Sequence, residues 1–303
     1  MVAIRSAARG DGDFLGFSFR HYLYRIPCYS VAEQDCIAAI LSTIDKAIAQ
    51  TEAIIAKQQR IKTALMQDLL TRGIDEHGNI RSEETHVFKD SPLGRIPVEW
   101  EVSPIEEKLA QIIDYRGRTP NKIEGGVPLL TAKNVRDGYV EEEPREFIPE
   151  FAYQKWMTRG IPEAGDVLFT TEAPMGNVAR VPEWKIALAQ RLLTLCPKKH
   201  DLSQDYLFWL LHWRRTTERL EILTSGSTVI GVKQSVFRKV IFSFPKKDEQ
   251  DRITRIFDSH KNLVAHEKAQ LAKLRRQKTA LMQDLLTGKV RVTPLLEAQH
   301  TAD

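Results

Sequence analysis

The chain has 303 residues, is 42% hydrophobic and 28% charged, and carries a net charge of +4, which permits a polyanionic partner without requiring one. No apolar run approaches the ~18 residues of a membrane span, and the first residues lack the apolar core of a signal peptide, so we expect a soluble, cytoplasmic protein. The three cysteines, Cys28, Cys36 and Cys196, lie far apart, which argues against a disulfide framework or a zinc ribbon.

One stretch of ten residues, KTALMQDLLT, occurs twice, at 62–71 and again 216 positions later at 278–287. The same shift aligns Glu33-Gln34-Asp35 with Glu249-Gln250-Asp251, and no gap is needed from position 33 to position 74. Upstream, FRHYLYRIP at 19–27 resembles FRKVIFSFP at 237–245. The duplicated unit is therefore a strand-like segment, a proline, a Glu-Gln-Asp start and a long segment.

Both long segments are predicted to be helices, which we assign to residues 28–74 and 246–290. Their apolar residues recur every three or four positions, as at Ile37, Leu41 and Ile44 in the first copy. No Pro or Gly interrupts either run, and a helix of this size would be about 55–60 Å long. We expect the two to pair as an antiparallel, coiled-coil-like spacer; a duplicated helix bundle with a purely structural role is the alternative.

The residues between the helices have a different pattern. Residues 75–92 are polar and turn-rich and predict a linker or an irregular loop, whereas from 93 to 245 short apolar runs alternate with Gly and Pro, as β-strands do. Four such runs are expected to form strands, at 125–135, 165–181, 188–198 and 227–245, with one helix at 205–223. The predicted fold class is α+β, with one mostly-β globule at 93–245, two flanking helices and a disordered tail at 291–303.

Several motifs, taken in order, resemble those of specificity subunits of type I restriction–modification systems. The opening is Gly94-x-Ile96-Pro97-x-x-Trp100, followed by Tyr115-Arg116 with Thr119-Pro120, by Asn134-x-x-x-Gly138, and by Gly165-Asp166 before a strand and Gly176-Asn177-Val178-Ala179 after it. The closing motif is a proline, then Glu-Gln, then a long helix that stops at Leu285-Leu286-Thr287-Gly288. The resemblance covers residues from about 19 to 290 and implies a target-recognition domain between two conserved helices.

The chain departs from that family pattern in one respect. A usual family member has two recognition domains, whereas this sequence shows one, and residues 1–27 resemble only the exit of another. The resemblance therefore implies a truncated or half specificity subunit. Its partners would be double-stranded DNA, methyltransferase subunits, indirectly the restriction subunit, and a second copy or another half-subunit.

Such a protein must hold basic and hydrogen-bonding side chains over DNA, where phosphate contacts give affinity and base-edge contacts give sequence. Four stretches supply them: YRGRTPNK at 115–122, TAKNVRDG at 131–138, TTEAPMGN at 170–177 and TSGSTVIGVKQS at 224–235. For the first three, the respective alternatives are a solvated basic turn, a hairpin turn and an ordinary strand–turn–strand. The candidate DNA-binding residues are Arg116, Arg118, Thr119, Asn121, Lys122, Lys133, Asn134, Arg136, Thr171, Asn177, Ser227, Thr228, Lys233 and Gln234.

The identical decapeptides suggest two equivalent docking sites for methyltransferase subunits, because exposed helix positions drift after a duplication unless each copy meets the same kind of partner. The candidate partner-binding residues are Lys62, Met66, Gln67 and Asp68 in the first copy, and Lys278, Met282, Gln283 and Asp284 in the second. A solvated helix face is the alternative for the neighbouring charges.

No catalytic motif was found. The sequence has no methyltransferase Asn/Asp-Pro-Pro-aromatic motif, no GxGxxG, no GxxxxGK[ST] and no HExxH. We therefore expect a non-catalytic subunit without a metal or cofactor of its own; the resemblance implies that S-adenosylmethionine, ATP and magnesium bind the partner subunits. The rival hypothesis is a regulatory or reserve protein that occupies methyltransferase subunits without reading DNA.

Overall fold

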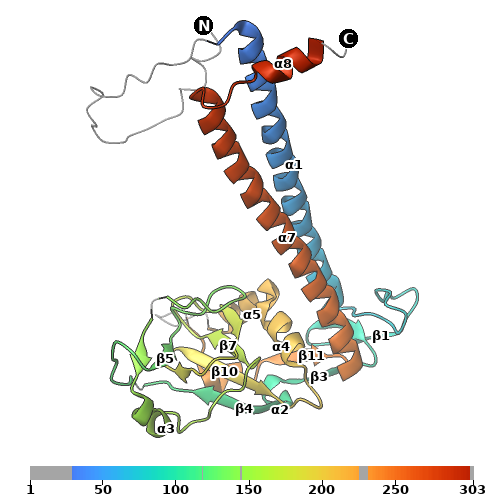
Figure 1. Cartoon of the computed structure of the whole chain (residues 1–303). Helices are drawn as coiled ribbons and strands as arrows, with labels where there is room; N and C mark the ends of the chain where they lie inside the picture. The colour runs from blue at the N-terminus through green and yellow to red at the C-terminus, as the bar shows by residue number, and fades with distance from the viewer. Residues whose placement is uncertain (1–28, 118, 144, 225–230, 301–303) are drawn as a thin grey trace. The chain divides into compact units, whose positions relative to one another are not determined.

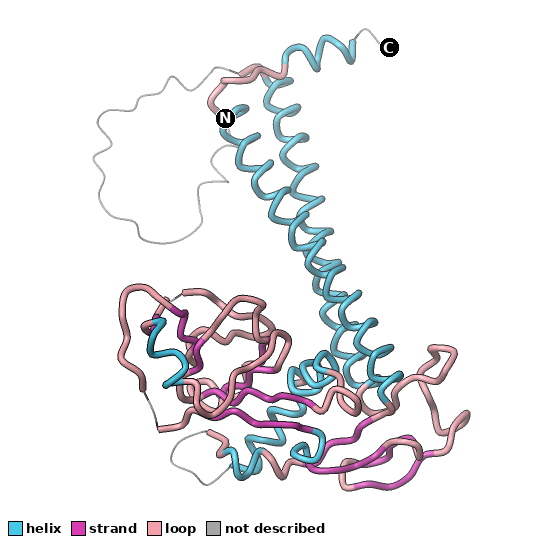
Figure 2. Tube along the Cα trace, turned by 60° about the horizontal axis from the view of Figure 1, so that its bottom comes forward, coloured by secondary structure: helices cyan, strands magenta, loops and turns pink. Residues whose placement is uncertain are grey.

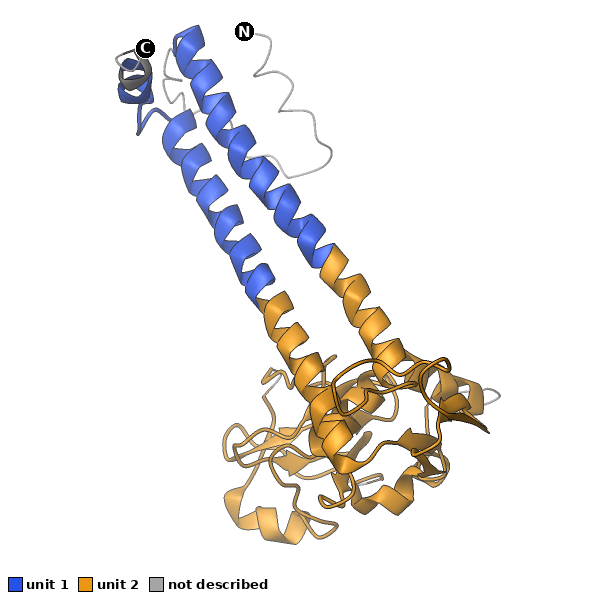
Figure 3. Ribbon diagram, turned by 90° about the vertical axis from the view of Figure 1, so that its right-hand side faces the viewer, with its two compact units in different colours: residues 1–56, 266–303 blue, residues 57–265 orange. Residues whose placement is uncertain are grey.

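The structure, a computed structural model, describes residues 29–117, 119–143, 145–224 and 231–300. It divides into two compact units, residues 1–56 with 266–303 and residues 57–265 (Figure 3). Two long helices, α1 (Val31–Leu69) and α7 (Lys247–Leu286), contribute residues to both units. No helix in the described ranges is long and apolar enough to cross a membrane.

In the first unit the two helices run antiparallel, as predicted. Buried Ile37, near the start of α1, packs with Leu285 at the end of α7. Further along, the Nζ of Lys278 lies 2.6 Å from the Asp45 carboxylate, and Arg275 lies 2.7 Å from that of Glu52. The helices thus contact each other through ion pairs as well as apolar residues, which fits an irregular, coiled-coil-like pair better than a regular leucine zipper.

The start of α1 is held by a capping box. The Ser30 backbone N–H donates to the Glu33 carboxylate (3.0 Å), and the Glu33 N–H donates back to the Ser30 hydroxyl (3.3 Å). The same carboxylate accepts hydrogen bonds from both Nε and Nη2 of Arg291. Beyond Arg291 the chain forms α8 (Thr293–His300), so the prediction of a disordered tail is wrong for these residues.

The second unit holds every strand that the structure describes (Figure 2). A four-stranded antiparallel sheet has the order β4 (Leu109–Asp114), β10 (Leu192–Pro197), β7 (Val167–Thr170), β8 (Val178–Arg180). A three-stranded sheet has the order β6 (Phe147–Ile148), β5 (Val127–Leu130), β9 (Ala187–Leu188). Two pairs complete the strands: β1 (Phe88–Ser91) with β2 (Gly94–Pro97), and β3 (Glu101–Pro104) with β11 (Ile241–Phe244). Short helical segments link them: α2 (Ile105–Lys108), η2 (Glu150–Ala152), α3 (Tyr153–Trp156) and α6 (Gln234–Phe237).

The two interior strands of the four-stranded sheet, β10 and β7, are buried on both faces because apolar residues occupy successive positions. In β7, Val167 and Phe169 belong to one hydrophobic cluster, whereas Leu168, between them, belongs to another. In β10, Leu193 and Leu192 divide in the same way. Successive side chains of a strand point to opposite faces, so the sheet separates the two clusters.

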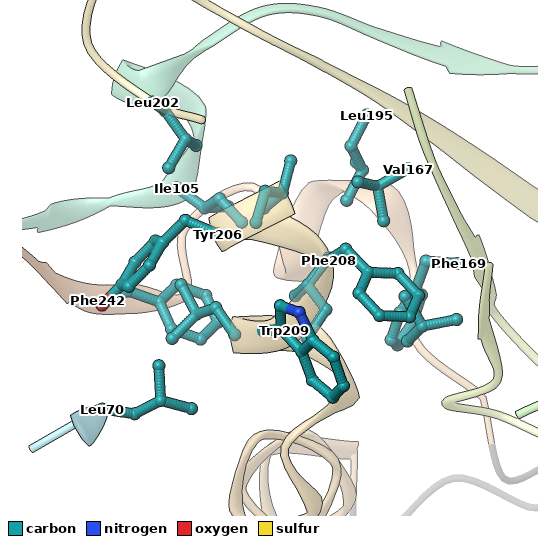
Figure 4. Close-up of a cluster of buried hydrophobic side chains, with 14 of the residues drawn as sticks. Leu70, Ile105, Val167, Phe169, Leu195, Leu202, Tyr206, Phe208, Trp209 and Phe242 are labelled. Atoms are coloured by element: carbon teal, nitrogen blue, oxygen red, sulfur yellow. The ribbon is translucent and has the colours of Figure 1, made fainter. Parts of the chain in front are cut away.

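The first of these clusters is built around α4 (Gln204–His212), whose Tyr206, Phe208 and Trp209 are drawn with their neighbours in Figure 4. The prediction of one helix at 205–223 is wrong, since α4 ends at His212 and α5 (Arg214–Thr224) begins after it. Trp213 between them is extended, and the Thr216 hydroxyl donates to the Leu210 carbonyl (2.6 Å). The break lets both helices contribute to the same hydrophobic cluster, α5 through Leu220, which periodicity alone does not reveal.

The start of α7 is clamped by a buried ion pair. The Glu249 carboxylate accepts hydrogen bonds from Arg81 (2.5 and 3.1 Å), from the Ile74 N–H (3.0 Å) and from the Trp100 indole (3.3 Å). Residues 75–87 form turns and loop, as one of the two alternatives predicted, but they are not a linker, because Arg81 is buried. Strand β1 follows and pairs with β2 across the expected boundary at Leu93. Of the long run at 227–245, the described residues 231–245 form a strand only at β11, since α6 precedes it.

Within this unit, too, α1 and α7 lie side by side (Figure 1). The His260 ring lies 3.1 Å from the Gln58 side-chain oxygen, and Leu69 shares a hydrophobic cluster with Ile253 and Phe257. In the 216-residue repeat Ile253 and Leu69 correspond to Ile37 and Leu285, the pair that packs in the first unit. The duplicated sequence thus places the equivalent residues in a hydrophobic cluster in each unit.

Candidate nucleic-acid interface

Loops that follow or precede β5, β7 and β10 meet around a pocket of about 340 Å³. Six neutral or basic polar side chains from separate parts of the chain line it, namely Thr119, Lys122, Thr131, Lys133, Gln190 and Arg191, together with the Glu146 carboxylate. Three of these six were predicted from the sequence as DNA contacts. The strands hold the loop ends, so the side chains project from a rigid base.

The loop at 115–122 is anchored by its first residue. Tyr115 is buried, stacks on Trp156 at 5.6 Å, donates a hydrogen bond to the Gly160 carbonyl (3.1 Å) and accepts one from the Arg159 N–H (3.0 Å). Burial raises the pKa of the Tyr115 phenol. The following residue, Arg116, is exposed, and its backbone N–H is held by the Asp114 carboxylate (2.8 Å). Thr119, Asn121 and Lys122 are exposed, whereas Arg118 lies outside the described residues.

In the loop at 131–141, not every predicted DNA-binding residue is exposed. Lys133 is exposed and Arg136 half-exposed, with Arg136 2.5 Å from the Glu141 carboxylate. Asn134, by contrast, is 1% exposed. Its Oδ1 accepts from the Thr131 N–H and hydroxyl (3.0 Å each), and its Nδ2 donates to the Glu141 carbonyl (3.1 Å). Asn134 thus stabilises the turn, as the alternative hypothesis held, and its burial contradicts its prediction as a DNA-binding residue.

Two further candidates also serve the fold. The Nδ2 of Asn177 donates to the Val135 carbonyl (2.9 Å), which ties the strand turn to the 131–141 loop. Thr171 is 5% exposed; its N–H donates to the Arg191 carbonyl (3.1 Å) and its carbonyl accepts from the Val232 N–H (2.9 Å). Thr171 and Asn177 therefore connect loops of the fold and do not belong to the surface that could contact DNA directly. Lys233 is exposed and Gln234 half-buried at the start of α6, while Ser227 and Thr228 lie outside the described residues.

Sequence reasoning missed Gln190 and Arg191. The run LAQRLLTLCPK was predicted as one strand, but β9 ends at Leu188 and β10 begins at Leu192, so the two polar residues form a turn at the pocket. The Arg191 Nε lies 3.0 Å from the Glu172 carboxylate. The polar pair within an otherwise apolar run was the signal available in the sequence.

Four of the cations at this surface have carboxylate neighbours. Besides the pairs of Arg136 and Arg191, Lys122 lies 2.8 Å from Glu146 and Arg116 lies 3.9 Å from Asp114. These cationic side chains are each 42–52% exposed, and solvent-exposed ion pairs contribute only about 0–1 kcal/mol. A phosphate can therefore replace the carboxylate beside Arg116, Lys122 or Arg136 at small cost. The described residues contain no group of His, Cys, Asp or Glu that could hold a metal ion.

The two copies of the decapeptide have different surroundings. In the first, Met66 is 5% exposed and belongs to the hydrophobic cluster around α4, so its prediction as a partner contact is wrong. Lys62 lies 3.1 Å from the His212 ring and over the Trp209 ring. Asp68 pairs with Arg72 (3.7 Å), and Gln67 is exposed.

In the second copy the equivalent surface is open. Met282 is 40% exposed, Gln283 is exposed, and Leu286, the counterpart of buried Leu70, is 47% exposed. Lys278 pairs with Asp45 (2.6 Å) and Asp284 with Lys289 (3.1 Å). Identical sequence thus yields a covered face in one unit and an uncovered face in the other.

Comparison with known proteins finds a matching family model and several relatives of this chain. Residues 97–276, more than half of the chain, match the family model described as the type I restriction modification DNA specificity domain. The chain is 28% identical over 282 residues to the type I restriction enzyme MjaVIII specificity subunit of Methanocaldococcus jannaschii, covering 89% of this chain and 63% of that protein. It is 27% identical over 274 residues to the putative MjaX specificity subunit of the same organism, covering 88% and 60%.

Solved structures show the same fold. An HsdS subunit from Thermoanaerobacter tengcongensis matches with a TM-score of 0.54 at 22% identity, over 88% of this chain and 61% of that one. A chain from a structural study of type I R-M complex assembly matches with a TM-score of 0.56 at 22% identity, over 88% and 62%. This chain therefore spans less than two thirds of the length of these relatives.

Proposed function

Because this chain belongs to the type I restriction–modification DNA specificity family, we propose that it reads part of a DNA target for a modification complex. The observation that carries the proposal is the pocket where Lys122, Lys133, Gln190 and Arg191 converge from separate loops of the matched domain. Lysines suit phosphates as mobile point charges, whereas Arg and Gln suit base edges, which they bind with two hydrogen bonds.

The proposed reading surface consists of described side chains that are exposed or half-exposed. It comprises Arg116, Thr119, Asn121, Lys122, Lys133, Arg136, Gln190 and Arg191, with Lys233 and Gln234 as further candidates. Asn134 and Asn177 hold this surface in shape. The overall charge of +4 is small, so attraction to DNA depends on this local cluster and on exchange of its carboxylate neighbours for phosphates.

Catalysis, in this proposal, belongs to partners. The chain docks methyltransferase subunits, which bring S-adenosylmethionine, and through them the restriction subunit, with its ATP and magnesium. The open face at Met282, Gln283 and Leu286 supports docking there, because exposed large apolar side chains that gather on one helix face are typical of interaction sites. A second recognition domain, from another copy or another half-subunit, would complete a two-part site.

The rival function is occupation of methyltransferase subunits without reading DNA. The experiment that separates the two is selection of bound duplexes from a random pool by the chain with its methyltransferase subunit, repeated at low and high salt. Enrichment of one sequence, with affinity that falls as salt rises, supports reading. A stable complex that enriches no sequence at either salt supports the rival.

A further inference from the structure

The backbone around the pocket is strained at two places. Among the described residues, only Ala173 and Arg191 combine a side chain with a positive φ, at 54° and 70°, and both line this pocket. Such conformations are uncommon for residues other than glycine, and they persist only where the surrounding structure imposes them, often at functional sites.

The backbone of Arg191 is held by the strand that follows it, and its side chain is held by a carboxylate. Leu192, which follows it, is 2% exposed and starts an interior strand of the four-stranded sheet. The Arg191 carbonyl accepts the Thr171 N–H, and its Nε meets the Glu172 carboxylate at 3.0 Å. Glu172 is itself fixed by an antiparallel bridge to Gly231. The guanidinium is thus aimed by backbone and carboxylate together, while its side chain remains 52% exposed.

The chemistry of the pocket distinguishes Arg191 from its neighbours. It is the only arginine among the pocket's described lining residues, whose other cations are Lys122 and Lys133. The bidentate contact of a planar guanidinium with O6 and N7 is the commonest specific contact to guanine, and a lysine ammonium lacks the planar fork that makes such a site selective. A preorganised arginine in a pocket that two lysines also line fits one base edge with phosphates nearby.

We propose, building on the DNA-reading function above, that Arg191 is a specificity-determining residue that contacts one guanine, and that Glu172 is its positioning residue. Lys122 and Lys133 neutralise phosphates beside that base pair. The strain at Arg191 sets the direction of the side chain, which a relaxed turn would leave free.

The test uses the complete complex with the methyltransferase subunit and a series of duplexes that vary the recovered target one base pair at a time. Arg191→Gly removes the side chain and relieves the positive φ, whereas Arg191→Lys keeps the charge but not the fork. Both should reduce discrimination at one G·C pair by about 10- to 100-fold and leave the other positions unchanged. Arg191→Lys should retain most of the affinity for random DNA.

Glu172→Gln should weaken discrimination at the same base pair only, and add little in the double variant with Arg191→Lys, because the two residues act as one unit. Lys199→Ala is the matched control, since Lys199 is an exposed cation paired with Glu163 (2.6 Å) that does not line the pocket. It should leave every position unchanged.

A uniform loss of affinity in Arg191→Gly, with full discrimination kept in Arg191→Lys, would show a phosphate contact and overturn the inference. Loss at many positions in Glu172→Gln would assign that residue a structural role instead. If the wild-type complex prefers no sequence, the proposed function itself fails. If it has a target that neither Arg191 variant alters, only this inference fails.

Discussion

At the scale of single residues, two glutamates at equivalent positions of the repeat hold the ends of the long helices. In the first unit, Arg291 donates to Glu33 through its Nε and Nη2. In the second, Arg81 donates to both carboxylate oxygens of Glu249. Both carboxylates are buried, at 5% exposed. The glutamate of each Glu-Gln-Asp start thus has a structural role. This role explains why the glutamate occurs in both copies, and no contact with a partner is needed to explain it.

The Arg81–Glu249 pair should matter more to stability than any surface pair. Arg81→Ala leaves a buried carboxylate without its cation, which costs about 3–5 kcal/mol. The control, Arg95→Ala, removes exposed contacts to Glu83 (3.0 Å) and Asp90 (3.3 Å) and should cost only about 0–1 kcal/mol. Urea unfolding measures both; equal losses would contradict the role assigned to Glu249.

Glu33 predicts a dependence of stability on pH. Hydrogen bonds from the Ser30 backbone and then from Arg291 lower the pKa of Glu33 from 4.5 to about 2. Because the folded pKa lies below the unfolded one, this stabilisation is complete above about pH 4.5 and disappears as the pH falls towards about 2. The melting temperature of Glu33→Gln should lie below that of the wild type at neutral pH, and the gap should narrow at about pH 3. A gap that stays constant with pH would contradict this assignment.

At the scale of elements, the end of α1 depends on one glycine. Gly73 has a φ of 63°, and a Cβ there would lie 2.1 Å from the Glu249 Oε1 and 2.5 Å from the Trp100 ring. Gly73→Ala should therefore disturb the clamp as well as strain the backbone. Gly78 is the matched control, since its φ is 85° but a Cβ would meet nothing within 4 Å.

Gly78→Ala should cost about 1–2 kcal/mol, the strain of the left-handed conformation alone. Gly73→Ala should cost clearly more, because it adds the displacement of a buried carboxylate. Thermal unfolding of the two variants measures the difference. Similar losses would show that the space around Gly73 plays no part.

Elements with a strong period were predictable, and those set by tertiary contacts were not. The antiparallel helices followed from the repeat and its apolar stripe, and β5, β7 and β10 lie within predicted strand runs. The break at Trp213 was missed because the apolar positions of α4 and α5 continue a helical pattern across it. Asn134 was misjudged because an Asn-to-Gly turn looks the same whether its side chain faces DNA or its own backbone. Arg191 was missed because a two-residue turn inside an apolar run has no Gly or Pro to mark it.

At the scale of the whole molecule, the repeat presents one covered and one open face. Met66 is 5% exposed and its counterpart Met282 is 40% exposed. Met282→Asp should therefore weaken co-purification with the methyltransferase subunit while leaving the melting temperature nearly unchanged, because surface substitutions cost little. Met66→Asp should instead unfold the protein by burying an unpaired charge. Undiminished co-purification of Met282→Asp would remove this face from the docking surface.

The central claim is that the chain directs a methyltransferase to a sequence. The most direct measurement is to combine it with its cognate methyltransferase subunit and S-adenosylmethionine on genomic DNA, and to map methylated adenines by single-molecule sequencing. We predict one recurring motif, which is an inverted repeat if two copies of this chain assemble, since two-fold protein symmetry is mirrored in the site. A stable complex that methylates no recurring motif would contradict the account and favour the protein that occupies methyltransferase subunits without reading DNA.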